Sequence, residues 1–169
     1  MQIVNSTKED VEFIFKLYRI ASAYQKSKGV VVWPEFDREM VETEIEENRQ
    51  WKILIDGQIA CIWATTFSDE AIWEEKNADQ AIYIHRLAVN PDFKGNNFVQ
   101  LMVDWAREHA KKHNKEFLRL DTLGHNKGLI KHYTAAGFRF LGIFHLTDTA
   151  DLPLHYQQEK DCCLFEMSV

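Results

Sequence analysis

The spacing of the hydrophobic residues changes along the chain, and this change limits the fold more than any other feature. Between Val11 and Ile45, apolar residues recur at helical spacing. Between Trp51 and Thr66, β-branched and aromatic residues form two strand-like runs, joined by the strong hairpin signal Asp56-Gly57. Strand-like and helical segments then alternate to the end of the chain. The pattern predicts an α/β fold in which helices pack on a sheet.

The predicted order of elements is β-α-α-β-β-β-α-β-α-β-β. The first half holds a strand, two helices and a hairpin: Gln2–Val4, a helix capped by Ser6 and Glu9 that ends near Gly29, Glu35 to about Asn48, Trp51–Ile55 and Gln58–Thr66. The second half starts with a polar connection and alternates thereafter: Ser68–Gln80, strand Ala81–Val89, a helix from about Phe98 to His113, strand Phe117–Asp121, helix Asn126–Ala136 closed by Gly137, strand Phe138–His145, a loop with Pro153, and strand Cys162–Met167. We expect one domain, residues 1–169, with a mixed, largely antiparallel sheet and helices on both faces.

Composition excludes several classes of protein. A chain of 169 residues can bury a substantial core. The formal charge of −6 argues against a nucleic-acid partner, because such proteins usually present a basic face. We expect no membrane partner either, since no apolar run approaches the length of about 20 residues that a span needs. The first residues also lack the pattern of a secretory signal.

The cysteines and two histidines carry no metal or redox motif. Cys61, Cys162 and Cys163 lack CxxC spacing, which predicts reduced thiols in a cytoplasmic protein. Cys162 and Cys163 are neighbours in a strand, so one is expected in the core and one at the surface. His109 and His113 share a helix face without a third ligand. We therefore expect no metal site, and we interpret both as cations near a helix C-terminus.

The segment AIYIHRLAVNPDFKGNNFVQLMVDWA has the features of an anion site. Its strand ends at Val89, Asn90-Pro91 turns the chain, and a loop with Lys94 and Gly95 opens a helix. Unpaired backbone N–H groups and the positive end of a helix dipole meet at such a junction. The segment is therefore a candidate pyrophosphate site.

The same segment resembles the GCN5-related N-acetyltransferase (GNAT) family. Members of that family carry a strand with a Leu-Ala-Val-like end, a proline, and an R/Q-x-x-G-x-G/A loop that opens a helix. The matching residues here are Leu87-Ala88-Val89, Pro91 and Lys94-Gly95-Asn96-Asn97-Phe98-Val99. A second family block, "N…Y…GF", is matched by Asn126, Tyr133 and Gly137-Phe138. Three positions depart from the pattern: Lys94 replaces Arg or Gln, Asn97 replaces the middle glycine, and Val99 replaces Gly or Ala.

The resemblance implies the GNAT fold, acetyl-CoA as co-substrate, and acetyl transfer to a primary amine of a small molecule or peptide. It assigns coenzyme binding to two groups of residues: Leu87, Ala88, Val89, Lys94, Gly95, Asn96, Asn97, Phe98 and Val99, and then Asn126 and Tyr133. A backbone N–H near Leu87 or Val89 would bond the thioester carbonyl. Tyr133 would act as the acid for the departing thiolate. Packing in a helix face and helix capping are the alternative roles of Tyr133 and Asn126.

The general base and the acceptor site are less defined. Many relatives carry a glutamate on the strand where this chain has Tyr83 and His85, so His85 is the candidate base or proton relay. A half-buried structural histidine, or a water chain in its place, is the alternative. Trp33, Trp73 and Tyr83 are candidate substrate-binding residues, since aromatic rings beside carboxylates can hold an amine. A solvated acidic face is the alternative interpretation.

Two further functions compete with catalysis. Val99 and the missing strand carboxylate favour a non-catalytic module of the GNAT fold that binds a coenzyme or small ligand. A structural interaction protein that has lost the pocket is the third reading. An exposed last strand would also allow a homodimer. The sequence does not identify the acceptor.

Overall fold

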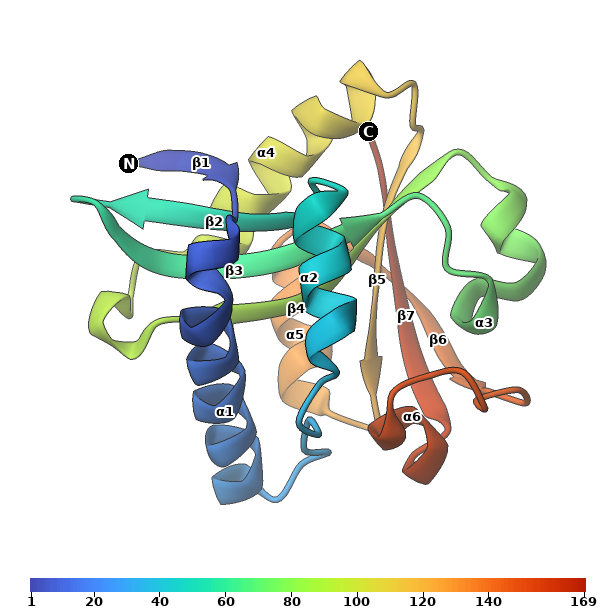
Figure 1. Cartoon of the computed structure of the whole chain (residues 1–169). Coiled ribbons are helices and arrows are strands. Elements are labelled where there is room, and N and C mark those ends of the chain that lie inside the picture. Colours follow the sequence, from blue (N-terminus) through green and yellow to red (C-terminus); the bar gives the residue numbers. More distant parts are fainter. The chain divides into compact units, whose positions relative to one another are not determined.

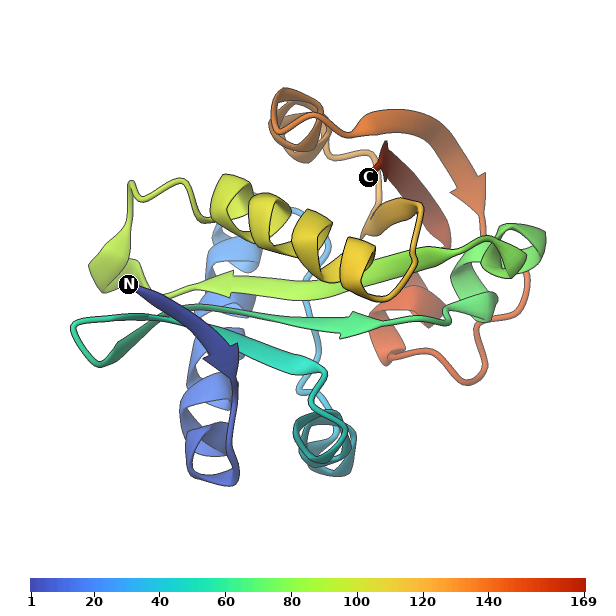
Figure 2. The same cartoon turned by 90° about the horizontal axis from the view of Figure 1, so that it is seen from above.

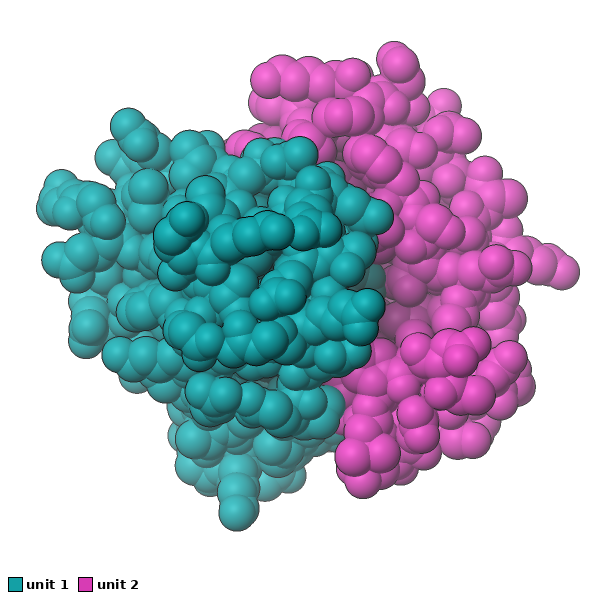
Figure 3. Space-filling view, viewed as in Figure 1, with its two compact units in different colours: residues 1–65, 85–97 teal, residues 66–84, 98–169 magenta.

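The computed structural model describes all residues, 1–169. Seven strands follow the order β1-β2-β3-β4-β5-β7-β6. The β4–β5 pair is parallel, whereas the β1–β2, β2–β3, β5–β7 and β6–β7 pairs are antiparallel. The predicted mixed, largely antiparallel sheet is therefore confirmed. Two compact units divide the chain: unit 1 comprises residues 1–65 and 85–97, and unit 2 comprises residues 66–84 and 98–169 (Figure 3).

Unit 1 begins with β1 (Gln2–Asn5) and the short 3-10 helix η1 (Lys8–Asp10), and its further elements are α1 (Val11–Lys28), α2 (Arg38–Glu46), β2 (Gln50–Ile55), β3 (Gln58–Thr66), the end of β4 (Ala81–Val89) and η3 (Pro91–Phe93). The hairpin prediction is confirmed, because Asp56 and Gly57 have φ angles of 50° and 77°. Gly29 ends α1, as predicted, and it has the left-handed conformation common at helix ends.

The predicted helix starts need correction. The capping box is formed by Thr7 and Asp10, one residue after the expected Ser6 and Glu9, and Thr7 N–H donates to Asp10 Oδ2 at 2.7 Å. Asp10 takes this capping position instead of Glu9 because its carboxylate also pairs with Lys52 of β2. The second helix is shorter than expected, since Asp37 caps it by accepting from the Glu39 N–H.

Helices α1 and α2 cover the same face of the unit 1 strands (Figures 1 and 2). Their apolar sides meet β3 and the end of β4 in one core cluster. The buried members are Val11, Ile14, Phe15, Leu17, Tyr18, Phe36, Val41, Ile45, Ile62 and Ala88. The apolar residues that recur at helical spacing in the sequence thus form the buried face of each helix.

Unit 2 contains more helix than predicted. Its elements are α3 (Glu70–Trp73), η2 (Glu74–Ala78), the start of β4, α4 (Phe98–Lys112), β5 (Phe117–Leu123), α5 (Lys127–Ala135), β6 (Arg139–His145), α6 (Leu154–Gln158) and β7 (Asp161–Ser168). The expected connection Ser68–Gln80 is thus largely helical, and the loop after Pro153 holds α6. These helices are too short to be marked by a hydrophobic period, so the sequence did not reveal them.

Arg119 of β5 holds the α3–η2 segment in place. Its side chain is 1% exposed and is bonded to Asp79, to Glu166 Oε2 at 2.8 Å and to the Lys76 carbonyl oxygen at 2.6 Å. The guanidinium also lies 4.8 Å from the centre of the Trp73 ring. A buried cation with several acceptors therefore connects this segment to β5 and to Glu166 of β7.

The cysteines are free, as predicted, but the expected surface position is wrong. Both Cys162 and Cys163 are fully buried, and β7 lies between β5 and β6. The expectation of an exposed last strand is therefore wrong, and a homodimer stays a prediction without that support. Burial raises the pKa of the Cys61 thiol to about 12, so this thiol stays protonated. None of the helices combines the length and the apolar character needed to cross a membrane.

The interpretation of His109 as a cation is also wrong. Burial, helped by the nearby His113 and Lys112, lowers the pKa of His109 to about 4. The ring stacks on Trp105 with centroids 4.7 Å apart and lies 4.3 Å from the His113 ring. His109 is therefore a neutral packing residue at pH 7.

We predict that His109 makes the protein acid-sensitive. The folded-state pKa of about 4 lies below the ordinary value of about 6.5, so between these values only the unfolded state binds the proton. The free energy of unfolding should therefore fall as the pH drops from 6.5 to 4. Urea unfolding of the wild type and His109→Gln at pH 7, 5.5 and 4.5 measures this effect. The variant should lose less stability than the wild type; parallel profiles would contradict the prediction.

Candidate functional site

Strand β4 departs from ordinary strand torsion angles at Arg86, inside the strand that the sequence predicted from Ala81 to Val89. Arg86 has a φ of 51° and is the only non-glycine residue inside a strand with a positive φ. The left-handed conformation costs an L-residue about 1–2 kcal/mol. A left-handed residue inside a strand is typical of a β-bulge, which reorients the strand beyond it, and we infer such a bulge at Arg86 from its φ angle. The peptide that carries the Leu87 N–H is thus turned away from regular strand geometry.

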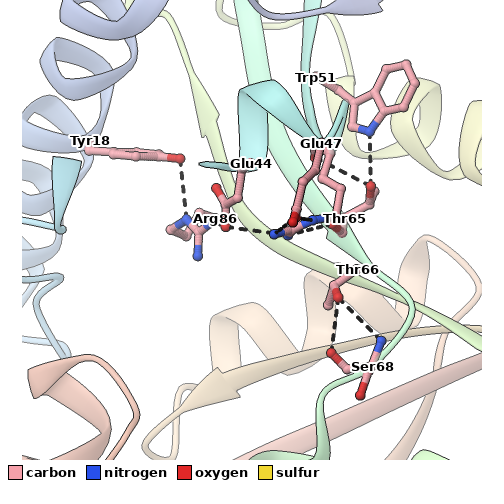
Figure 4. A network of polar contacts seen from close by, with 9 residues as sticks. Tyr18, Glu44, Glu47, Trp51, Thr65, Thr66, Ser68 and Arg86 are labelled. Atoms are coloured by element: carbon pink, nitrogen blue, oxygen red, sulfur yellow. Dashed lines mark hydrogen bonds and ion pairs between the residues drawn. The ribbon is translucent and has the colours of Figure 1, made fainter. Parts of the chain in front are cut away.

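The Arg86 side chain contacts both helices of unit 1 (Figure 4). Its guanidinium forms an ion pair with Glu44 of α2, and Nε donates to Tyr18 Oη of α1 at 3.4 Å. It also lies 5.4 Å from the centre of the Phe36 ring. Burial alone would lower the pKa of Arg86, but Tyr18 and Glu44 outweigh burial and raise it. Arg86 therefore stays charged.

Asn90 fixes the turn that follows β4. Its side chain is 7% exposed, donates to the Ile59 carbonyl oxygen at 2.9 Å and accepts from the Asp92 N–H at 3.1 Å. Its backbone N–H donates to the Ala60 carbonyl oxygen at 2.9 Å. Asn90 thus anchors the turn to β3 and caps η3 at the same time.

The candidate anion loop, Lys94–Asn97, is exposed. Gly95 and Asn97 have φ angles of 91° and 46°. Asn97 can therefore replace the middle glycine of the pattern, because asparagine tolerates the left-handed conformation. Asn96 Nδ2 donates to the Phe93 carbonyl oxygen at 2.8 Å and stiffens the loop. Left-handed residues within a short loop turn successive N–H groups toward one side, which is the geometry that binds anions.

Phe98 and Val99 are the first residues of α4 and are 4% and 6% exposed. Val99 is helical, so its position does not need the positive φ that a glycine would allow. Both side chains are packed inward. Any contact with a ligand would therefore come from their backbone N–H groups, which are unpaired in the first turn of a helix.

In unit 2, Asn126 caps α5 by accepting from the Leu129 N–H at 3.1 Å. The capping role is confirmed, and a coenzyme contact stays a prediction. Tyr133 is half-buried on the same helix, with its ring 5.5 Å from Phe165 and 6.1 Å from Phe138. Its predicted role as an acid is independent of this packing, since only the hydroxyl would take part.

The predicted acceptor residues lie in different surroundings. Trp33 is half-buried in unit 1, where its ring lies 5.9 Å from Tyr18 and 5.7 Å from Phe36. Trp73 and Tyr83 are buried in unit 2 around Arg119. His85, the candidate base, is partly exposed and directly precedes the bulge. Their roles in binding and catalysis stay predictions.

The structure also brings together two carboxylates that the sequence did not single out. In unit 2, carboxylate oxygens of Asp69 and Asp121 lie within 4.8 Å of each other. Tyr156 Oη donates to Asp121 Oδ2 at 2.7 Å. Burial, followed by the charge of Asp121, raises the pKa of Tyr156 well above its usual value, so this hydroxyl keeps its proton. The two aspartates are 52 positions apart in the chain, so no local pattern connects them.

Comparisons with known proteins agree with these features. A family model described as the acetyltransferase (GNAT) family matches residues 16–138. The uncharacterized N-acetyltransferase YesJ of Bacillus subtilis (strain 168) is 25% identical over 142 residues, 79% of each chain. A GNAT-family acetyltransferase structure from Listeria monocytogenes has a TM-score of 0.78 at 21% identity and covers 99% of this chain and 94% of its own. The structure of yncA from Salmonella typhimurium was solved with its cofactor acetyl-CoA. It has a TM-score of 0.69 at 12% sequence identity, and the match covers 99% of this chain and 93% of the yncA chain. The two structures show the fold.

We predict that Gly95 and Asn97 respond differently to substitution. Gly95→Ala places a side chain at a φ of 91°, where space is open but the backbone is strained, so the free energy of unfolding should fall by about 1 kcal/mol. Asn97→Gly replaces a left-handed asparagine with a residue that adopts this conformation freely. The free energy of unfolding should therefore change by less than about 0.5 kcal/mol. Denaturant unfolding of both variants measures the difference. Equal stabilities would mean that residue 95 does not hold this conformation in solution.

Proposed function

This chain belongs to the acetyltransferase (GNAT) family, and on that premise we propose that it transfers an acetyl group from acetyl-CoA to a primary amine of a small molecule or peptide. The family uses acetyl-CoA, and one protein of similar fold was solved with it. The observation that carries the proposal is the exposed Lys94–Asn97 loop, in which Gly95 and Asn97 have positive φ angles.

The loop fits a pyrophosphate group. The Cβ position of Gly95 has no heavy atom within 4 Å, so a ligand can approach the backbone there. Lys94 is exposed and adds a cation beside the loop. Backbone N–H groups of residues 95–97 would bind the phosphate oxygens, and Lys94 would balance part of their charge. Bound acetyl-CoA supplies an activated acetyl thioester.

The end of β4 would bind the reacting carbonyl. We assign this role to the backbone N–H of Leu87 or Val89, which follow the bulge at Arg86. A fixed N–H donor stabilises the negative charge that develops on the carbonyl oxygen when an amine attacks. Ala88 between them is 3% exposed and packed in the unit 1 core, so the backbone here is held firmly.

Proton transfer needs an acid and a base. The hydroxyl of Tyr133 would donate a proton to the sulfur that leaves when the C–S bond breaks. The amine arrives protonated at neutral pH and must lose a proton before it attacks. His85 would accept that proton, directly or through water, because an imidazole titrates in the required range.

Recognition of the acceptor amine would use acidic and aromatic groups. The Asp69 and Asp121 carboxylates supply negative charge within 4.8 Å of each other, which suits a protonated amine. Trp33 of unit 1 is a separate candidate, because a half-buried tryptophan can offer a cation–π surface to an amine. These groups leave the identity of the acceptor open among small molecules and peptides that carry a primary amine.

The first test measures binding before turnover. Titration calorimetry with acetyl-CoA should give saturable binding to the wild type, and Gly95→Ala should bind more weakly because its loop is strained. An assay of thiol release over a panel of primary amines then tests transfer. No binding would refute the proposal, whereas binding without thiol release would identify a non-catalytic module.

The second test addresses the acid. Tyr133→Phe removes one hydroxyl and keeps the ring packing, so kcat should fall by about a hundredfold while the Kd for acetyl-CoA changes little. Tyr24→Phe is the matched control, since Tyr24 is 60% exposed on α1. An unchanged kcat in Tyr133→Phe would exclude Tyr133 as the acid.

A further inference from the structure

We infer that Arg86 is a positioning residue, whose contacts with Glu44 and Tyr18 fix the left-handed bulge of β4 and thereby the direction of the Leu87 N–H. The inference rests on the proposed function, which assigns the thioester carbonyl to that region of β4. Arg86 itself need not touch the substrate. It would act through the backbone that follows it.

The backbone alone does not explain the conformation of residue 86. An arginine in a strand normally adopts a negative φ, and unlike glycine or asparagine it has no preference for the left-handed region. The φ of 51° therefore persists only if the surroundings stabilise it. Sites of this kind are often held by contacts of the side chain.

The side chain of Arg86 is held from two helices (Figure 4). Glu44 of α2 pairs with the guanidinium, and the side chains of Arg86 and Glu44 are only 12% and 7% exposed. Tyr18 of α1, itself 2% exposed, accepts a hydrogen bond from Nε. If Arg86 returned to an ordinary strand conformation, its side chain would leave Glu44. A buried carboxylate would then lose its closest cation, since Arg49 lies 3.9 Å away.

The backbone is also fixed on the other side of Leu87. Ala88 belongs to the buried core of unit 1 together with Tyr18 and Phe36. Leu87 thus lies between a residue held by an ion pair and a residue held by packing. The peptide between Arg86 and Leu87 has little freedom to rotate, so its N–H points in one direction before any ligand binds. Such preorganisation is what a donor to a developing oxyanion requires.

The test uses Glu44→Gln, which keeps the size of the side chain but removes its charge, and Tyr18→Phe, which removes only the hydroxyl. The infrared carbonyl stretch of bound 13C-labelled acetyl-CoA reports the hydrogen bond to the thioester directly. The wild type should lower this frequency relative to free acetyl-CoA, and both variants should lose part of the shift. Affinity for CoA, which has no carbonyl at this position, should change by less than about twofold, whereas kcat should fall by about tenfold.

Arg38→Gln is the matched control. Arg38 also joins α1 and α2, pairing with Glu12 and Glu42, and its guanidinium lies 5.5 Å from the centre of the Phe15 ring. The Arg38→Gln substitution therefore removes a similar set of contacts, but at the surface of the same unit. We expect this variant to keep the carbonyl shift and kcat of the wild type.

The outcomes separate the inference from the proposed function. If the wild type does not bind acetyl-CoA, the proposed function fails and the inference fails with it. If the wild type binds with a shifted carbonyl and folded Glu44→Gln and Tyr18→Phe keep the shift and kcat, only the inference is overturned. An equal loss in Arg38→Gln would also overturn it, because the effect would then be a general loss of packing.

Discussion

The ion pair between Arg86 and Glu44 is the interaction on which the arrangement of unit 1 depends. Both side chains are buried, and breaking such a pair by removing one partner typically costs about 3–5 kcal/mol. The pair connects α2 to β4 at the point where the strand leaves regular geometry. The same contact that contributes to packing therefore also determines how the chain enters the turn at Asn90 and the loop beyond it.

Local features of the fold could be predicted from the sequence because their cause is local. Asp56-Gly57 and Gly29 have positive φ angles where the sequence indicated a hairpin and a helix end. Asn97 has the left-handed conformation expected at a glycine position, and Asn126 caps α5. In each case one residue type tolerates or stabilises one backbone conformation. The identity of that residue is therefore enough to predict the local structure.

Features that depend on distant partners could not be predicted. Nothing near Arg86 in sequence indicates a bulge, because Glu44 lies 42 positions away. The sequence predicts a polar connection for the α3–η2 segment because Arg119, which binds this segment, belongs to the distant strand β5. The sequence predicts a helix-terminal cation at His109, but burial lowers its pKa and the ring packs against Trp105 and His113. The Asp69 and Asp121 pair was missed for the same reason, since only the fold makes them neighbours.

Each unit thus has one largely buried arginine that holds a backbone segment in place. Arg119 binds the segment that holds two short helices, and Arg86 binds from a left-handed position within a strand. Guanidinium groups suit this role because they stay charged when buried and bond several acceptors at once. The two cases differ in what the fixed backbone offers. The Arg119 acceptors are satisfied within the protein, whereas the peptide after Arg86 leads to the segment for which we propose coenzyme binding. The buried guanidinium of Arg86 is therefore best understood as a group that fixes the direction of the following backbone N–H.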